Sequence, residues 1–419
     1  MGLIAMPENS RGRLLFVTPA MPATGGNGLA MRAGNLLEAL SVKWDVHLLV
    51  LAVGGVENVA LEPALQPFAA KWRELPYGEM LDPAFVAAAN TPVGPAQCAA
   101  FERLGRPRDA AYRNSAVDAA YAAFSDMSFD VVFVLRQYMA PLAARFLDAS
   151  PRPLSMLDCD DDDVETRLRF ARVLEQYGQT DGAQLEAVTA QLYAAWEKEW
   201  LPRFDIVLAA SPVDSLRISD RNPDVFVDVM PNVVRAPLPG DGRTGAQTGP
   251  LLLVGNLSYL PNVDAVITFC RNILPLIRAQ DPALAEVVVA GSNPVDAVRA
   301  LADQPGVTVL ANPPEIALLY AKARAAVVPL RAGGGTRIKI LEAFAHGVPV
   351  ISTPLGAEGL DVEAGRHLVV ADTPEAFAAA CIDIARDDGL RSELVTQARQ
   401  LQKTEYSIEA LRARFRNAA

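Results

Sequence analysis

The stretch of sequence with the clearest capacity for chemistry is a glycine-rich turn ahead of two cations and a carboxylate. Gly333, Gly334 and Gly335 follow an apolar run that ends at Leu330, and a helix is predicted to begin near Thr336. The start of a helix presents free backbone N–H groups and the positive end of its dipole, both of which favour phosphate. These residues therefore predict an anion site.

Two cations and a carboxylate follow in the predicted helix, which should end at Gly347. Arg337 and Lys339 would add full positive charges beside the N–H groups. Glu342 lies about 10 Å of helix rise beyond Gly335, and its side chain leans back towards the helix start. A carboxylate there suits a ribose, because both vicinal hydroxyls are donors. The alternatives are a tight turn with two solvated cations, and a Lys339–Glu342 pair worth tenths of a kcal/mol.

The carboxyl half of the chain reads as alternating strands and helices. Strands are predicted from apolar patterns at 251–254, 287–290, 307–309, 325–330 and 348–351. A helix is predicted at 263–279, and Gly255 and Asn256 follow the first strand. Such alternation with short loops predicts a parallel sheet wrapped by helices, with ligands beyond the carboxyl ends of the strands.

The amino half shows the same alternation. Strands are predicted at 14–18, 46–51, 131–135, 154–157 and 206–209. The first turn contains Gly25, Gly26, Asn27 and Gly28, a weak indication of a phosphate site. As a dinucleotide fingerprint the turn fails, because Met31 occupies the third small position and no acid follows the second strand.

A linker is predicted between Pro231 and Pro250, where the sequence turns to proline, glycine and polar residues. The linker separates an amino-terminal domain at 1–235 from a carboxyl-terminal domain at 236–400. Residues 401–419 are predicted as a helix that packs back towards the first domain. The expected fold is α/β, with two doubly wound, Rossmann-like parallel-sheet domains that face each other across a ligand-binding cleft.

The composition excludes several classes of protein. Of 419 residues, 51% are hydrophobic and 21% charged, which excludes a disordered chain. Lysine and arginine total 38 against 49 acidic residues, and the net charge of −11 argues against a nucleic-acid partner. Four widely spaced cysteines predict neither a zinc site nor a disulfide framework. No segment suits a signal peptide or a membrane span, so the expected location is the cytoplasm, with peripheral association at the inner face of the membrane left open.

Together these motifs resemble the carboxyl half of a GT-B glycosyltransferase of the group 1, or family 4, type. The supporting segments are VGNLSYLPNVDAV at 254–266, GGGTRIKILEA at 333–343, HGVPVIST at 346–353 and GAEGL at 356–360. The amino half agrees more loosely, through LLFVTP and GGNG. The resemblance implies a retaining enzyme without metal or other cofactor. Its substrates would be a nucleotide diphosphate sugar, as donor of a hexose-type sugar, and a glycan, lipid-linked or small-molecule acceptor.

The resemblance also implies roles for residues of the donor site. Glu342 would hold the ribose, and Arg337 and Lys339 would lie on the diphosphate. The turn at 25–28 would face the donor phosphate and the reacting sugar. Many relatives have a glutamate that contacts the sugar at the position of Gly334, and an arginine and a lysine in the loop at 255–259. Arg337 and Lys339 are inferred to replace that second pair.

Candidates for acceptor contact come from the amino half. Arg136, Gln137 and Tyr138 follow the strand at 131–135, and Asp160 lies in the acidic run DCDDDD at 158–163. Clustered carboxylates can bind Mg²⁺ or Mn²⁺, but this run opens a predicted helix, which favours capping or acceptor contact. Two other functions stay open: a nucleotide-sugar epimerase on the same fold, and a non-catalytic, two-lobed sugar-binding protein.

Overall fold

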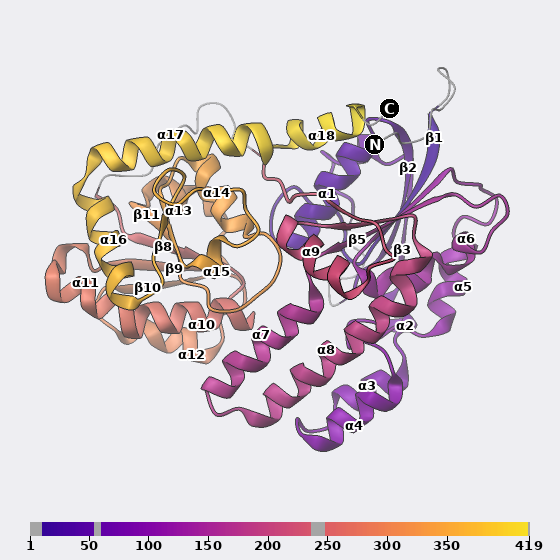
Figure 1. Ribbon diagram of the computed structural model, residues 1–419, viewed down its shortest axis with the longest axis horizontal. Coiled ribbons are helices and arrows are strands. Elements are labelled where there is room, and N and C mark those ends of the chain that lie inside the picture. The colour runs from indigo at the N-terminus through magenta and orange to yellow at the C-terminus, as the bar shows by residue number, and fades with distance from the viewer. Residues whose placement is uncertain (1–10, 54–59, 236–247, 418–419) are drawn as a thin grey trace. The chain divides into compact units, whose positions relative to one another are not determined.

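The computed structural model describes residues 11–53, 60–235 and 248–417, and the chain divides into two compact units. Unit 1 comprises residues 1–232 and 411–419, and unit 2 comprises residues 233–410. Most of the predicted linker, at 236–247, lies outside the described residues. Each unit contains a parallel sheet with helices packed against it, which confirms the expected α/β class with two Rossmann-like domains (Figure 1).

The sheet of unit 1 has the strand order β3-β2-β1-β4-β5-β6-β7, and the paired strands are parallel. Its strands are β1 Gly12–Thr18, β2 Trp44–Leu51, β3 Lys71–Leu75, β4 Val131–Leu135, β5 Leu154–Asp160, β6 Ile206–Ala209 and β7 Val227–Val229. The apolar runs predicted the central strands. The edge strands β3 and β7 were missed because an edge strand is only half covered and lacks such a run.

Unit 1 also contains α-helices, most of which pack on the sheet. They are α1 Gly28–Leu40, α2 Tyr77–Met80, α3 Pro83–Ala89, α4 Pro95–Leu104, α5 Asn114–Ala122, α6 Ala144–Leu147, α7 Asp163–Gln176, α8 Thr180–Trp200, α9 Pro212–Arg221 and α18 Ile408–Asn417. Helices α3 and α4 instead pack against α8. The long helices α7 and α8 run side by side (Figure 1). In α18, the Phe415 ring lies 6.0 Å from the Trp44 ring at the start of β2.

The sheet of unit 2 has the order β10-β9-β8-β11-β12-β13, again with parallel pairs. Its strands are β8 Leu251–Val254, β9 Val287–Gly291, β10 Val307–Ala311, β11 Ala325–Val328, β12 Val350–Ser352 and β13 Val369–Val370. Its helices are α10 Leu260–Thr268, α11 Leu274–Gln280, α12 Asp296–Arg299, α13 Ile316–Lys322, α14 Ile338–His346, α15 Pro354–Ala357, α16 Pro374–Arg386 and α17 Asp388–Glu405.

The points where the chain enters and leaves unit 2 are joined by hydrogen bonds. The backbone N–H of Val234 donates to the Tyr406 carbonyl at 2.9 Å. The side-chain amide of Gln402, which is buried, donates to the Val234 carbonyl at 3.2 Å. The first and last segments of unit 2 are therefore neighbours.

The helix predicted at 263–279 is present, but part of it is not α-helical. A π-helical turn at Phe269–Ile273 separates α10 from α11. Pro275 lies in the first turn of α11, where it has no N–H to donate and its ring would clash with the carbonyl four residues earlier. The wider π turn accommodates this proline without ending the helical path.

Replacing Gly347 with alanine is expected to lower the free energy of unfolding by roughly 1–2 kcal/mol. Gly347 ends α14 in the left-handed region at φ 67°, and an added Cβ would lie 2.7 Å from Cζ of Arg399. Gly105 ends α4 at the same φ but faces open space, so Gly105→Ala is the matched control for backbone strain alone. Urea denaturation measures both variants, and an unchanged midpoint for Gly347→Ala would contradict the prediction.

Candidate functional site

The candidate site of unit 2 lies where the order of the strands reverses. The chain builds β8, β9 and β10 towards one edge and then returns to add β11 on the other side of β8. Ligands of such sheets bind beyond the carboxyl ends of the two strands at this switch point. Gly255 and Asn256 follow β8, and the turn at 333–335 follows β11. The topology therefore brings these predicted residues together at the carboxyl ends of two central strands, β8 and β11.

The glycine turn depends on backbone conformations that other residues disfavour. Gly333 has φ 116° and Gly335 has φ 66°. The guanidinium of Arg337 folds back over the turn and donates to the carbonyl of Gly335 at 2.9 Å and to that of Gly334. The helix begins at Ile338, two residues later than predicted, because Arg337 has a non-helical backbone and precedes the first turn.

Thr336 completes the turn with a buried hydroxyl. Its residue is 8% exposed, and within the described residues its Oγ1 has no hydrogen-bond partner. A buried hydroxyl without a partner is costly, so a ligand that hydrogen-bonds to it would gain more than at a solvated position. This observation favours a polar ligand at the turn over the alternative of an ordinary tight turn.

Lys339 is held by an amide and not by a carboxylate. Its Nζ donates to Oδ1 of Asn262 at 2.6 Å, and Nδ2 of Asn262 donates to the Asn256 carbonyl at 2.9 Å. Burial lowers the pKa of Lys339 to about 7, and the neighbouring charge of Arg337 contributes. Among the described residues Lys339 makes no ion pair with Glu342, so the alternative of a helical salt bridge is not what the fold builds.

Glu342 lies three residues after Lys339 on α14 and contacts a buried tyrosine. The hydroxyl of Tyr320, on α13, donates to Oε2 of Glu342 at 3.3 Å, and the Tyr320 ring stacks on His346 at 4.9 Å. Burial raises the pKa of Glu342 to about 7, although the Tyr320 hydrogen bond and Lys339 oppose the rise. Sequence reasoning missed both Tyr320 and Asn262. The sequence PNVD at 261–264, inside the motif VGNLSYLPNVDAV, was the available signal for Asn262.

The glycine turn of unit 1 also lies at a switch point, between β1 and β4. Gly26 has φ 94°, and a Cβ added at Gly25 or Gly26 would meet nothing within 4 Å, so the backbone faces open space. Oδ1 of Asn27 accepts from the backbone N–H of Ala30 at 2.8 Å and caps α1, which begins at Gly28. The side-chain oxygen of Asn27 thus caps its own helix, and Gly25, Gly26 and Asn27 are all exposed.

The candidates that follow β4 differ in accessibility. Arg136, at φ 72°, donates from Nη1 to Asp161 at 2.5 Å and from Nη2 to Asp163 at 2.7 Å. Gln137 is fully buried and donates to Asp163 at 2.9 Å. Tyr138 is also buried, and its carbonyl accepts from a tyrosine hydroxyl. The structure therefore places Arg136 at the carboxyl end of β4, where it is partly exposed, and places Gln137 and Tyr138 beneath the surface.

The acidic run at 158–163 faces arginines. Asp158 forms a bidentate ion pair with Arg32, and both N···O distances are 2.8 Å. Asp160 lies 3.5 Å from both Arg32 and Arg136, and burial raises its pKa to about 7. Asp162 accepts from the N–H of Glu165 at 3.1 Å, which confirms that the run caps α7. In the described parts of the chain, no three His, Cys, Asp or Glu side chains are arranged to hold a metal ion.

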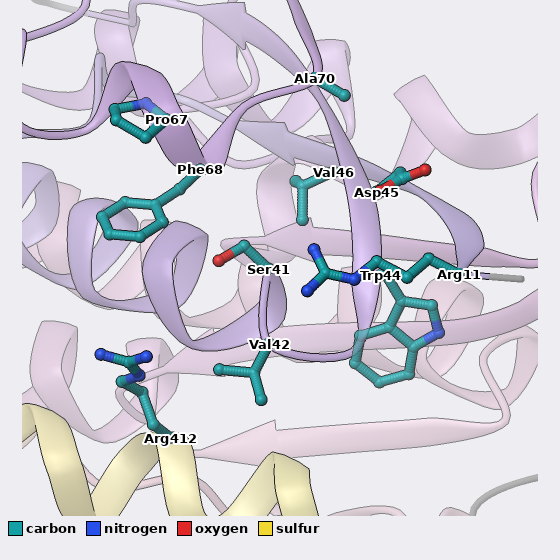
Figure 2. A pocket seen from close by; sticks show the side chains of 10 residues that line it. All are labelled: Arg11, Ser41, Val42, Trp44, Asp45, Val46, Pro67, Phe68, Ala70 and Arg412. Carbon is teal, nitrogen blue, oxygen red and sulfur yellow. The ribbon is translucent and has the colours of Figure 1, made fainter. Parts of the chain in front are cut away.

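A separate pocket of about 390 Å³ lies in unit 1, near the start of β2 (Figure 2). Strand β2 begins at Trp44, so this pocket lies at the amino ends of the strands. The glycine turn lies at the opposite, carboxyl ends. None of the predicted site residues lines the pocket. Its lining residues are Arg11, Ser41, Val42, Trp44, Asp45, Val46, Pro67, Phe68, Ala70 and Arg412.

Comparison with known proteins finds a family model that matches much of unit 2. Residues 249–387 match the family model described as "Glycosyl transferases group 1". Over 156 residues the chain is 24% identical to an "Uncharacterized 44.6 kDa protein in cps region" of Klebsiella pneumoniae. That alignment covers 35% of this chain and 40% of the length of the relative.

Solved structures share the fold of the whole chain. Sucrose-phosphate synthase from Thermosynechococcus elongatus superposes with a TM-score of 0.68 and 16% identity, over 97% of both chains. HepE of Anabaena, solved in complex with UDP and glucose, gives a TM-score of 0.61 and 14% identity, over 97% of this chain and 98% of that one. These similarities confirm the predicted GT-B fold. Across the described residues, no helix combines the length and apolar character that crossing a membrane requires.

Proposed function

Because residues 249–387 match the family model of the group 1 glycosyl transferases, we propose that the chain transfers a hexose-type sugar from a nucleotide diphosphate sugar to a hydroxyl group of an acceptor. The observation that carries this proposal is the convergence at the switch point of unit 2. There a glycine turn and Arg337 precede helix α14, which carries Lys339 and the half-buried carboxylate of Glu342. This set matches a diphosphate followed by a ribose.

In the proposed reaction the bond between the sugar and the diphosphate breaks, and its electron pair moves to the departing phosphate oxygen. Preorganised cations and N–H groups stabilise the negative charge that develops there. Arg337, Lys339 and the hydroxyl of Thr336 would supply this stabilisation without a metal ion. The acceptor oxygen would bond to the anomeric carbon on the face that the phosphate leaves, and its proton would pass to the departing phosphate, which gives retention of configuration.

On the acceptor side we propose contact through Asp160 and Arg136. Their side chains remain 14% and 12% exposed, whereas Gln137 is fully covered. The acceptor class is a glycan, a lipid-linked sugar or a small molecule. The relative from a cps region and the UDP and glucose held by HepE support a role in glycan assembly. We place the reaction in the cytoplasm, with a lipid-linked acceptor presented at the inner face of the membrane.

A thermal-shift panel with UDP-, GDP-, ADP- and TDP-glucose tests the proposal. A ligand at about one hundred times its dissociation constant stabilises the folded state by about 2.7 kcal/mol. NMR of the donor then separates the outcomes. Slow release of sugar with a retained anomeric configuration supports a transferase, interconversion of donor sugars indicates an epimerase, and binding without turnover indicates a sugar-binding protein. Activity that disappears with EDTA would contradict the metal-free mechanism.

Donor affinity is expected to peak near pH 7. Lys339 has a pKa of about 7 and loses its charge above that pH, so the diphosphate binds more weakly, by up to about tenfold per pH unit. Glu342 also has a pKa of about 7 and gains a proton below that pH, so it loses an acceptor for the ribose hydroxyls. Calorimetric titration with the nucleotide sugar that binds in the thermal-shift panel measures the dissociation constant at each pH. Glu342→Gln should remove the acid limb, and a flat profile in the unmodified protein would contradict the prediction.

A further inference from the structure

We infer that Asn262 is a positioning residue that orients Lys339 towards the donor diphosphate while leaving the lysine's positive charge uncompensated. This inference rests on the proposed function, since it assigns Lys339 to the diphosphate. It concerns a residue of α10, a helix that none of the predicted catalytic residues occupies.

The side chain of Asn262 joins the two sides of the switch point. It is 7% exposed, accepts from Nζ of Lys339 at 2.6 Å and donates to the Asn256 carbonyl at 2.9 Å. The loop after β8 is itself closed, because Oδ1 of Asn256 accepts from the backbone N–H of Ser258 at 3.0 Å and from its hydroxyl at 2.8 Å. One amide therefore fixes the position of Lys339 relative to the loop after β8.

The loop is shaped to bring Asn262 this close. A Cβ added at Gly255 would lie 2.6 Å from Nδ2 of Asn262, so a larger residue at 255 would require the Asn262 side chain to move. Both polar atoms of the amide are used, the oxygen by Lys339 and the nitrogen by the loop. Because the amide donates on one side and accepts on the other, neither a carboxylate nor an apolar side chain of similar size could make both bonds.

The charges around Lys339 explain why a neutral partner matters. Arg337 lowers the pKa of Lys339, and Glu342 opposes this effect. On α10 the nearby carboxylate of Asp264 pairs with Nε of Arg331 at 3.0 Å. From α13, the hydroxyl of Tyr320 is bonded to the Lys339 carbonyl. The position that faces the amine carries no charge, so an arriving diphosphate would find a cation that is not already neutralised.

The decisive variant is Asn262→Asp, which would place a carboxylate against the amine. We expect its affinity for the best-bound of UDP-, GDP-, ADP- and TDP-glucose to fall at least about tenfold near pH 7. The reason is that the new carboxylate would pair with the lysine and compensate its positive charge. The same ion pair should move the alkaline limb of the affinity profile to higher pH. Asn262→Leu loses the orienting bond without adding charge, so its affinity should also fall while its alkaline limb stays at or below that of the unmodified protein.

Asn272→Asp is the matched control, because Asn272 is exposed on the π turn of the same domain. It should bind the donor as the unmodified protein does. Equal pH profiles for Asn262→Asp and Asn262→Leu would overturn the inference and leave Asn262 with a role in loop structure alone. Affinity within about threefold of the unmodified protein in both variants would also overturn it.

A ligand-free readout separates this inference from the proposed function. NMR titration of the lysine amines in the full chain should show a higher pKa for Lys339 in Asn262→Asp than in the unmodified protein, with or without donor. If the unmodified protein binds none of the four nucleotide sugars, the proposed function fails. If it binds one and the Lys339 titration is the same in Asn262→Asp, the inference fails alone.

Discussion

Lys339→Met is expected to lower kcat by about 100- to 1,000-fold, the range seen when one preorganised donor to a developing negative charge is removed. Lys339 is the proposed contact of the departing diphosphate, and methionine keeps the length of the side chain without its charge. Because the charge on the phosphate is greatest in the transition state, kcat should fall more than donor affinity. Single-turnover assays with saturating donor measure the effect.

The same substitution should leave the protein at least as stable as before. Burial lowers the pKa of Lys339 from 10.5 to about 7, so folding penalises the charged amine, and the penalty is fully present below pH 7. Methionine removes that penalty, and the melting temperature should stay the same or rise. Lys322→Met is the control, because Lys322 is exposed on the same domain. A Lys339→Met enzyme with unchanged kcat would eliminate Lys339 from the mechanism.

Arg32→Met is expected to lower the free energy of unfolding by about 3–5 kcal/mol, the usual cost of removing one partner of a buried ion pair. Arg32 is 3% exposed and Asp158 is fully buried. Burial alone would lower the pKa of Arg32, but the carboxylates of Asp158 and Asp160 reverse this and raise it. Arg32 also donates to the Met230 carbonyl at 2.9 Å, so its replacement leaves both the Asp158 carboxylate and this carbonyl without the hydrogen bonds that Arg32 makes.

The double variant Arg32→Met, Asp158→Leu is the informative control. Replacing a buried ion pair by apolar side chains of similar volume is often close to neutral, so the double variant should recover much of the lost stability. Guanidinium denaturation of the unmodified protein, the single variants Arg32→Met and Asp158→Leu, and the double variant measures the coupling between the two positions. A loss below about 1 kcal/mol in Arg32→Met alone would show that water or another group reaches Asp158.

The elements that the sequence predicted well are those with one dominant signal. Continuous apolar runs located the central strands, because a strand buried on both faces needs such residues along its whole length. The turn at 333–335 and the helix end at Gly347 were predictable because their backbone conformations require glycine. The π turn before Pro275 had a signal in the proline itself, which the apolar periodicity of the surrounding helix outweighed.

The residues that the sequence did not reveal are polar groups whose partners are distant along the chain. Asn262 and Lys339 are separated by 77 residues, and Arg32 and Asp158 by 126. No periodicity or spacing encodes such a pair, since each depends on how strands are ordered in the sheet. A weak signal existed for Arg32: it stands among the small and apolar residues of α1, where a cation must be either exposed or paired.

The hydrogen bonds that join Val234 to Tyr406 and Gln402 have a topological meaning. Unit 2 is a continuous insertion into unit 1, which takes residues from both ends of the chain, and the insertion begins and ends at neighbouring points. Inserted domains with adjacent ends can be exchanged between hosts without separating the host's own termini. Under the proposed function, in which unit 2 binds the nucleotide sugar, unit 2 could be recombined with different acceptor-binding domains, and residues 233–410 are the natural segment to transplant.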